Sequence, residues 1–123
     1  MKTIDTEKAP AAIGPYSQAM VSGGFVFTSG QIPVDPRSGE IIGADVTAQA
    51  EQVLKNIGAV LAAAGSGYER VVKATCFLAS MDDFAAFNAV YGKYMTNKPA
   101  RSCVAVKTLP KNVLCEVEVI AEV

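Results

Sequence analysis

The apolar positions in residues 46–64 repeat with the period of an α-helix. Apolar side chains recur every three or four residues and form one stripe: Val46, Ala50, Val53, Leu54, Ile57, Val60, Leu61 and Ala64. Asp45 is suited to cap the start of this helix and Gly65 its end. The polar residues Gln49, Gln52, Lys55 and Asn56 lie off the stripe. We therefore expect the apolar face of this helix to cover a sheet.

Residues 114–123 alternate between apolar and polar positions, as in a strand with one buried face. The set Cys115, Val117, Val119, Ala121 and Val123 is expected to lie beneath the helices, and Glu116 and Glu118 on the opposite face. In the preceding strand, near 102–106, Ser102, Val104 and Val106 form one set, and Arg101, Cys103 and Ala105 form the other. If the two strands pair with their apolar sets together, Arg101 and Cys103 lie on the same face as Glu116.

The remaining pattern completes the fold prediction. Short strands near 19–21 and 25–29 flank the turn residues Ser22, Gly23 and Gly24, and a tight turn is expected at 35–39. Residues 71–79 are typical of a strand inside a sheet, and 82–94 of a second helix. The order predicts a single domain over 1–123: an α/β (α+β) two-layer sandwich, with a mixed sheet and two helices on one face. The uncovered sheet face favours an oligomer.

Composition excludes several classes of protein. The net charge is −1 and no basic run occurs, so we expect no nucleic-acid partner. We find neither an apolar stretch of the roughly 20 residues that a membrane span needs nor the apolar core of a signal peptide. We therefore expect no membrane partner and a cytoplasmic location. The three cysteines have no zinc-site spacing, so no metal site is predicted, and we expect reduced thiols.

Arg101 is the sharpest candidate for chemistry, because a guanidinium can hold a small carboxylate through two parallel hydrogen bonds. The alternatives are a structural ion pair with Glu116 or Glu118 and a solvated charge at a strand edge. Glu116 is either an exposed charge or a group that orients or activates a water molecule. Cys103 is either a nucleophile or an inert thiol, and the chain contains no histidine to act as its base.

Two turn-rich segments offer further candidates. Ser29 and Gly30 end a strand, where the glycine lets a ligand approach the backbone and the serine offers a hydroxyl and an amide donor. Tyr16 follows Gly14 and Pro15 and forms either a pocket wall or a packing contact. Without further information, an ordinary turn is the favoured explanation of both segments.

Taken together, these segments resemble the Rid family (also called YjgF/YER057c/UK114), and its imine deaminase branch most closely. The matching segments are AAIGPYSQA at 11–19, TSGQIP at 28–33, DDFAAFN at 82–88 and PARSCV at 99–104. Residues 109–110 and 116–118 match as well. The resemblance covers essentially the whole chain in order, so it is more specific than any single motif.

The resemblance implies a chorismate-mutase-like fold that assembles as a homotrimer, with sites in the clefts between subunits. It also implies a 2-iminobutanoate/2-iminopropanoate deaminase, a hydrolase acting on C–N bonds. Such an enzyme converts the reactive imines and enamines released by pyridoxal-phosphate enzymes to 2-keto acids and ammonia, and so detoxifies these metabolites. No cofactor is implied.

Carried over by position, the resemblance gives each candidate a role. Arg101 would clamp the substrate carboxylate, and Glu116 would position the attacking water with help from backbone groups around Cys103. The other pocket-lining residues would be Tyr16, Ser29, Gly30 and Asn88. The loop at 94–99 looks shorter than the common family loop, with Lys98 where an aromatic residue often stands. Two alternatives remain: a nonenzymatic module that binds 2-keto acids, and an endoribonuclease or translation inhibitor.

Overall fold

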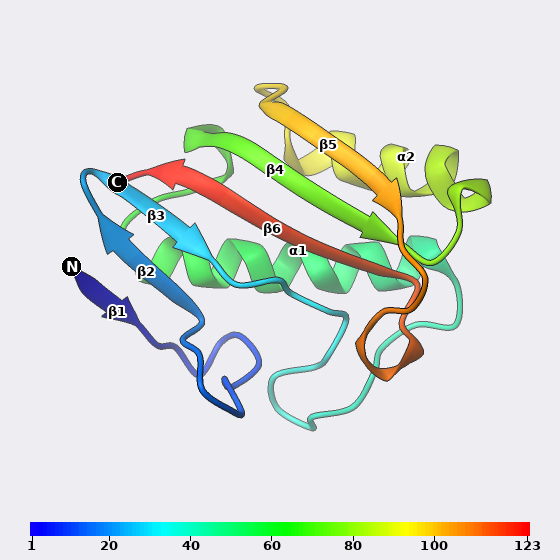
Figure 1. The fold of residues 1–123 in the computed structure, drawn as a ribbon, viewed down its shortest axis with the longest axis horizontal. Helices are drawn as coiled ribbons and strands as arrows, with labels where there is room; N and C mark the ends of the chain where they lie inside the picture. The colour runs from blue at the N-terminus through cyan, green and yellow to red at the C-terminus, as the bar shows by residue number, and fades with distance from the viewer.

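The computed structural model describes all 123 residues as one mixed sheet with two helices (Figure 1). The strands are β1 (Lys2–Ile4), β2 (Ala19–Ser22), β3 (Phe25–Thr28), β4 (Val71–Leu78), β5 (Ala100–Ala105) and β6 (Cys115–Glu122). The helices are α1 (Val46–Ala63) and α2 (Phe84–Tyr94), with short 3-10 turns at Tyr68–Arg70, Met81–Asp83 and Pro110–Asn112. The strand order is β1-β2-β3-β6-β4-β5.

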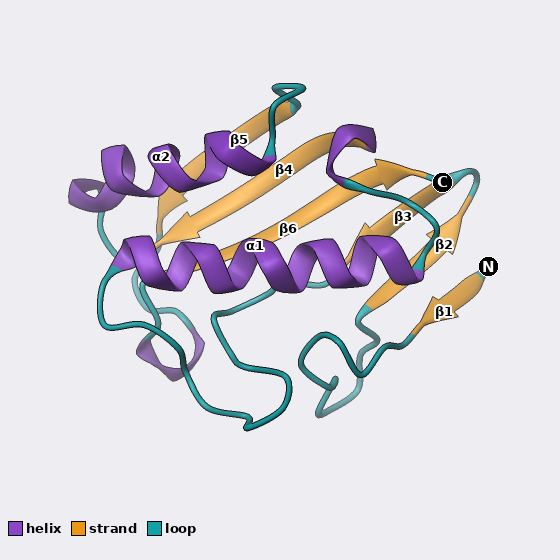
Figure 2. Cartoon of the chain, turned by 180° about the vertical axis from the view of Figure 1, so that it is seen from behind, coloured by secondary structure: helices purple, strands orange, loops and turns teal.

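Both helices cover the same face of the sheet, which confirms the predicted two-layer sandwich (Figure 2). The sheet is mixed because β4 and β5 are parallel while the other neighbouring pairs are antiparallel. The hairpin of β2 and β3 turns at Gly23 and Gly24, whose φ angles of 60° and 85° suit glycine. The sequence pattern missed β1, because three residues are too few to show an alternation.

Helix α1 begins and ends as predicted, but two of its polar side chains are not on the surface. The Ala48 N–H donates to the Asp45 carboxylate at 2.9 Å, and Gly65 follows the end of the helix. Gln49 and Asn56, however, are only 6% and 1% exposed. The expectation that they lie away from the buried face was wrong. Each side chain is covered by a loop and forms hydrogen bonds with the backbone of that loop.

These two buried amides form hydrogen bonds with the loops that precede α1 and β6. Asn56 donates to the carbonyls of Ile32 and Val34 at 3.1 and 2.9 Å. Gln49 donates to the Gly43 carbonyl and accepts from the Leu114 N–H at 2.7 Å, just before β6 begins. Because a buried amide needs hydrogen-bond partners, the loop backbones are fixed against α1.

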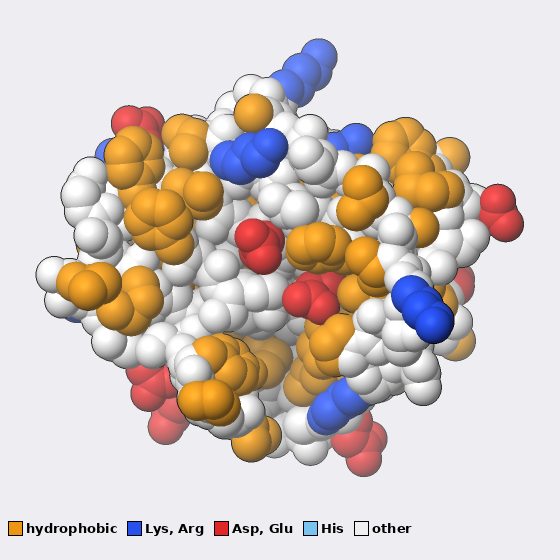
Figure 3. All heavy atoms as spheres, in the orientation of Figure 1, with side chains coloured by type: hydrophobic (Ala, Val, Ile, Leu, Met, Phe, Trp, Pro, Cys, Tyr) orange, Lys and Arg blue, Asp and Glu red, His pale blue; other side chains and the backbone are white.

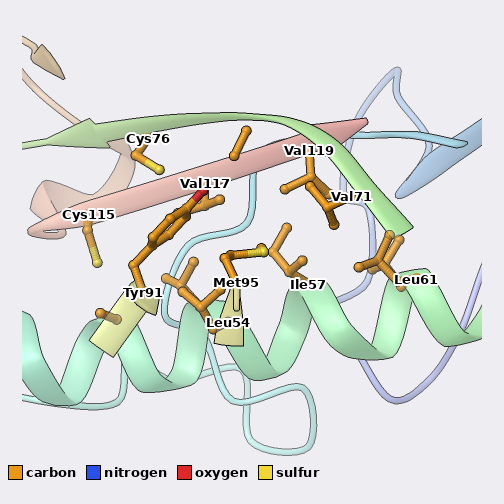
Figure 4. Close-up of a cluster of buried hydrophobic side chains, with 14 of the residues drawn as sticks. Leu54, Ile57, Leu61, Val71, Cys76, Tyr91, Met95, Cys115, Val117 and Val119 are labelled. Atoms are coloured by element: carbon orange, nitrogen blue, oxygen red, sulfur yellow. The ribbon is translucent and has the colours of Figure 1, made fainter. Parts of the chain in front are cut away.

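The hydrophobic core lies between the helices and the strands β4 and β6 (Figure 4). Leu54, Ile57 and Leu61 of α1 point towards the sheet, and Val117 and Val119 of β6 point back towards the helix. All five are at most 2% exposed. Burial of each such side chain contributes about 1.5–3 kcal/mol to folding. This core therefore holds the central strands in a fixed register beneath both helices.

Strand β5 pairs with β4 and not with β6, which contradicts the expected pairing. The register places Arg101 beside Ala74, and Cys103 beside Cys76, both of which are buried on the helix side. Arg101 and Cys103 therefore lie on the helix side, while Val104 is 46% exposed on the open side. The two faces of β5 were assigned the wrong way round, because an edge strand that is apolar on both sides gives no clear inner face.

The open face of the sheet carries both apolar and acidic side chains (Figure 3). The alternation of β6 places Glu116 and Glu118 on this face, and the register sets Phe27 and Ile120 side by side. Phe25 and Phe27 of β3 are 37% and 45% exposed. Figure 3 shows two acidic side chains near the middle of the face, with hydrophobic side chains gathered around them. No element of the chain covers this surface.

Candidate functional site

Arg101 is held against α2 by an amide and two aromatic rings. Its Nη1 donates to Asn88 Oδ1 at 2.7 Å. The guanidinium carbon lies 4.7 Å from the centroid of the Tyr91 ring and 5.6 Å from that of Phe84. Residues 84, 88 and 91 lie on one face of a helix, so a single surface of α2 supplies all three contacts. We call Arg101, Asn88, Tyr91 and Phe84 the arginine cluster.

The guanidinium in this cluster has no carboxylate partner within the chain. The one salt bridge in the chain joins Lys93 of α2 to Glu51 of α1. The alternative interpretation, a structural ion pair of Arg101 with Glu116 or Glu118, is therefore wrong. A guanidinium carries five N–H donors, and the only hydrogen bond from this one goes to Asn88. Its remaining donors can bind a carboxylate.

Cys103 lies beside Arg101 on the helix side of β5 but is not set up as a nucleophile. Burial raises the pKa of its thiol, and the nearby Arg101 opposes that rise only in part. A raised pKa keeps the sulfur protonated, and a protonated thiol is a weak nucleophile. Of the two interpretations of Cys103, nucleophile or inert thiol, the raised pKa disfavours a catalytic nucleophile.

Glu116 occupies the open face, where its side chain lies against Gly30. A methyl group added to Gly30 would overlap the Glu116 carboxyl group, whose Cδ would be 2.9 Å away. Gln31 and Val117 exchange backbone hydrogen bonds of 2.8 and 3.1 Å, which hold the 30–31 backbone against β6. Glycine at position 30 is thus what allows the carboxylate to lie across this strand end.

The surroundings of Glu116 raise the pKa of its carboxyl group above the usual value. Burial raises the pKa of this carboxyl group, and the charge of Glu118 on the same face raises it further. A carboxyl group with a raised pKa binds its proton more tightly, so its ionised form is a better acceptor for a proton from water. The position and the raised pKa both suit the predicted role of Glu116 in handling water.

Ser29 has both of its donors occupied. Its hydroxyl donates to the Ser17 carbonyl at 2.6 Å, and its N–H donates to the Gln18 carbonyl at 2.9 Å. The expectation that Ser29 offers a free hydroxyl and amide donor was therefore wrong. These bonds hold the preceding loop against the end of β3, and only the oxygen lone pairs of Ser29 remain for a ligand. We call Glu116, Gly30 and Ser29 the glutamate cluster.

Tyr16 is 53% exposed on that loop and lines the rim of an open groove of about 600 Å³. Apolar side chains, including Ile13, Ile32 and Val34, form the wall of the groove, and Arg37 and Lys111 add positive charge. Neither Arg101 nor Glu116 lines it. This groove is therefore not a site that contains either predicted catalytic group.

The arginine and glutamate clusters lie on opposite faces of the sheet. Strand β4 separates β5 from β6, and Glu116 points to the open side while Arg101 rests on α2. Neighbouring strands are about 4.8 Å apart, so the two backbones are about 10 Å apart with the sheet between their side chains. The expectation that Arg101 and Glu116 share a sheet face was wrong. Within one chain, the two groups therefore face opposite sides of the sheet.

Tyr91 and Phe84 were not predicted as supports for the guanidinium, because the sequence pattern indicates the second helix but not which strand packs against it. Asn88 between them was the available signal: a polar residue in register with two aromatic residues marks the face that receives a polar partner.

The structure contains no cluster of three His, Cys, Asp or Glu residues suited to a metal ion. None of its helices has both the length and the hydropathy of a membrane span.

Comparison with known proteins decides the family. The family model described as Endoribonuclease L-PSP matches residues 6–123. The chain belongs to this family, which is the Rid (YjgF) family. A relative from Escherichia coli K12 named 2-iminobutanoate/2-iminopropanoate deaminase is 52% identical, over 98% of this chain and 96% of its own. A Lactococcus lactis relative named as a regulator, AldR, is 54% identical, over 100% and 98%.

The fold comparison agrees with the sequence comparison. The crystal structure of E. coli TdcF with bound serine superposes with a TM-score of 0.95 at 46% identity, covering 100% of this chain and 99% of the other. The names of these relatives differ in the activity they state, while their fold is the same. The family is therefore established, and the individual activity has to be inferred from the residues of this chain.

Proposed function

We propose that this Rid-family protein hydrolyses small 2-imino acids, such as 2-iminobutanoate and 2-iminopropanoate, to 2-keto acids and ammonia. The observation that carries the proposal is the arginine cluster: a guanidinium fixed by Asn88 and Tyr91, with donors to spare and no carboxylate partner. The name of the E. coli K12 relative at 52% identity supports the same substrate class.

The chemistry needs little from the protein beyond orientation. Arg101 would hold the substrate carboxylate by two N–H donors, which fixes the imine carbon in the site. Glu116 would accept a proton from water as the water oxygen bonds to that carbon. The C=N π bond would open as the water adds, and the nitrogen would take the proton from Glu116 to give the carbinolamine. The hydroxyl proton would then pass to nitrogen as the C–N bond breaks, which releases ammonia and the keto acid. No covalent enzyme intermediate is required.

The active unit in this proposal is a homotrimer with a site between subunits. The supporting observation is the separation of the two clusters on opposite faces of the sheet, so a site with both groups needs the arginine cluster of one copy and the glutamate cluster of another. The uncovered sheet face, with Phe25, Phe27 and Val104 exposed, provides the apolar surface for association. Tyr16 and Asn88 would line the cleft between the copies.

A coupled assay tests the reaction. A serine or threonine dehydratase supplies the imine, and the rate of keto-acid formation is followed with and without this protein. We expect wild type to accelerate the hydrolysis and Arg101→Ala to abolish the acceleration. Arg70→Ala removes an exposed arginine outside the cluster and is expected to retain the activity. Saturable pyruvate binding without any rate effect would instead make the chain a nonenzymatic keto-acid binder.

A mixing experiment tests the shared site. Arg101→Ala and Glu116→Gln are each expected to be inactive alone. When the two are unfolded, mixed in equal amounts and refolded together, some clefts receive an intact arginine from one subunit and an intact glutamate from the next. Random assembly predicts about a quarter of the wild-type activity. A mixture as inactive as its components, with trimers present by light scattering, would contradict intersubunit sites.

The endoribonuclease description of the family model gives the second candidate activity. The net charge of −1 and the absence of a basic stripe disfavour binding to a phosphate backbone. Cleavage of RNA by highly purified protein, lost in Arg101→Ala but retained in Arg70→Ala, would favour this activity over imine hydrolysis.

A further inference from the structure

We propose that Cys76 and Cys103 form a reversible disulfide within one chain when the protein meets a hydroperoxide, which makes this pair an oxidation site that joins β4 to β5. The proposal rests on the strand register and on the different exposure of the two sulfurs. It does not depend on the reaction that the protein catalyses.

The two cysteines are direct neighbours across the parallel strands. The register pairs Cys76 with Cys103, and both side chains lie on the helix side of the sheet. Neighbouring strands are about 4.8 Å apart, within the Cα separation of about 4.4–6.8 Å that disulfides span. Strand β5 is the edge of the sheet and is bonded on one side only. It can therefore shift by the small amount that closure of the bond requires.

The third cysteine lacks such a neighbour. Cys115 of β6 is paired with Leu78, whereas Cys76 is paired with Val117 on that strand. The offset of two residues makes Cys76 and Cys115 diagonal neighbours, about 7–8 Å apart at Cα, beyond the span of a disulfide. Figure 4 shows both side chains pointing towards the helices from separate strands. Cys115 is as fully buried as Cys76, so it serves as an internal control.

Exposure decides which sulfur reacts first. Cys103 is half-buried, so solvent reaches its sulfur. Burial raises the pKa of its thiol, and Arg101 and Cys76 oppose that rise only in part, so the reacting form is a minor thiolate population. Cys76 is fully buried, and burial raises the pKa of its thiol to about 12, so it is inert towards a solvent-borne oxidant. The accessible sulfur would be oxidised, and the buried one would then resolve the product.

The two steps balance with the hydroperoxide as the only oxidant. The Cys103 thiol gives up its proton as its sulfur attacks hydrogen peroxide. An S–O bond forms and the O–O bond breaks, so Cys103 becomes a sulfenic acid, and the released hydroxide takes the thiol proton and leaves as water. The Cys76 sulfur then attacks the Cys103 sulfur. The S–S bond forms, the S–O bond breaks, and the departing hydroxide takes the Cys76 proton to leave as water. Two thiols are oxidised by two electrons, and one peroxide is reduced to two waters.

Peptide mapping of the folded protein tests the proposal directly. The protein is treated with hydrogen peroxide, quenched, unfolded in an alkylating reagent and digested without reductant. We expect the peptide containing Cys76 to be linked to the one containing Cys103, with only Cys115 alkylated, and the link to disappear after dithiothreitol. Cys115→Ser is expected to form the same link, and Cys76→Val to leave Cys103 unlinked to its own chain.

Three outcomes would overturn the proposal. Cys103 oxidised to the sulfinic acid while Cys76 is alkylated would show that the buried thiol does not resolve. A Cys103–Cys103 link between chains would place the reactive partner in another subunit. Alkylation of all three cysteines after treatment would show that neither sulfur reacts. Each is read from the wild-type protein, so none depends on whether a variant folds.

Discussion

The arginine cluster and the glutamate cluster differ in what holds their charged group in place. Arg101 is held by side chains of another element, namely an amide and two aromatic rings of α2. These side chains would remain if the arginine were removed. Glu116 is fixed by the absence of a side chain at Gly30 and by the backbone bonds of Gln31 and Val117. Side chains hold the charged group of the arginine cluster, whereas the close approach of backbone holds that of the glutamate cluster. Different substitutions are therefore expected to disrupt each cluster.

Adding a methyl group at Gly30 is expected to damage the glutamate cluster most. Gly30→Ala would push the Glu116 carboxyl group from its place, since the new Cβ overlaps it. Displacement of a catalytic group by about 1 Å costs about 10²-fold in rate, so we expect a loss of that size in kcat for imine hydrolysis. Pyruvate binding, measured by calorimetry, should change little because Arg101 is untouched.

Gly92→Ala is the matched control for that substitution. It adds the same methyl group on α2 in open space, and alanine favours a helix by about 1 kcal/mol over glycine. We expect unchanged activity and a slightly raised Tm. If Gly30→Ala were as active as wild type, the position of the Glu116 carboxyl group would not matter for the rate, and its proposed catalytic role would be wrong.

Removing the aromatic face under Arg101 is expected to weaken the arginine cluster. Tyr91→Leu eliminates a cation–π contact of about 1–2 kcal/mol, so we expect pyruvate affinity to fall about tenfold. Tyr91→Phe keeps the ring and removes a buried hydroxyl that has no hydrogen-bond partner. This variant should retain wild-type affinity and be at least as stable in thermal unfolding. If both variants bind pyruvate equally well, the ring does not orient the guanidinium.

A single charge change should move the pH profile of the glutamate cluster. Glu116 must be ionised to accept a proton, so the rate rises with pH through its raised pKa. Glu118→Gln removes the repelling charge, lowers that pKa and moves the acidic limb of kcat to lower pH. Glu122→Gln, an exposed carboxylate farther along β6, should leave the limb in place. If the acidic limb stays at the same pH in Glu118→Gln, that limb reports the ionisation of a group other than Glu116.

The same shift has a definite sign for stability. A raised pKa means that the folded chain binds this proton more tightly than the unfolded chain does. Folding stability from Glu116 therefore falls as the pH rises from the usual carboxyl value through the raised value. Glu118→Gln is expected to reduce this loss, as measured by the midpoint of urea unfolding above and below that interval.

The two clusters also differ in how far the sequence could predict them. Arg101 and Glu116 were found as chemically suitable residues, and the alternation of β6 placed Glu116 on the open face correctly. The partners of Arg101 could not be found that way, since contact between β5 and α2 depends on the packing of the whole layer. The overlap of Gly30 with Glu116 likewise joins segments 86 residues apart in the chain.

By itself, the sequence determined the periodic elements: α1 with its caps, the hairpin of β2 and β3, the buried β4 and the alternating β6. These follow from local rules, because each side chain must face either core or solvent at a period of 3.6 or 2. Only the tertiary structure decided that β5 pairs with β4, and hence that Arg101 and Cys103 face α2. Strand pairing joins distant segments, and an edge strand with apolar residues on both faces satisfies either orientation locally. The pairing with β4 therefore fixes which face of β5 lies under the helices.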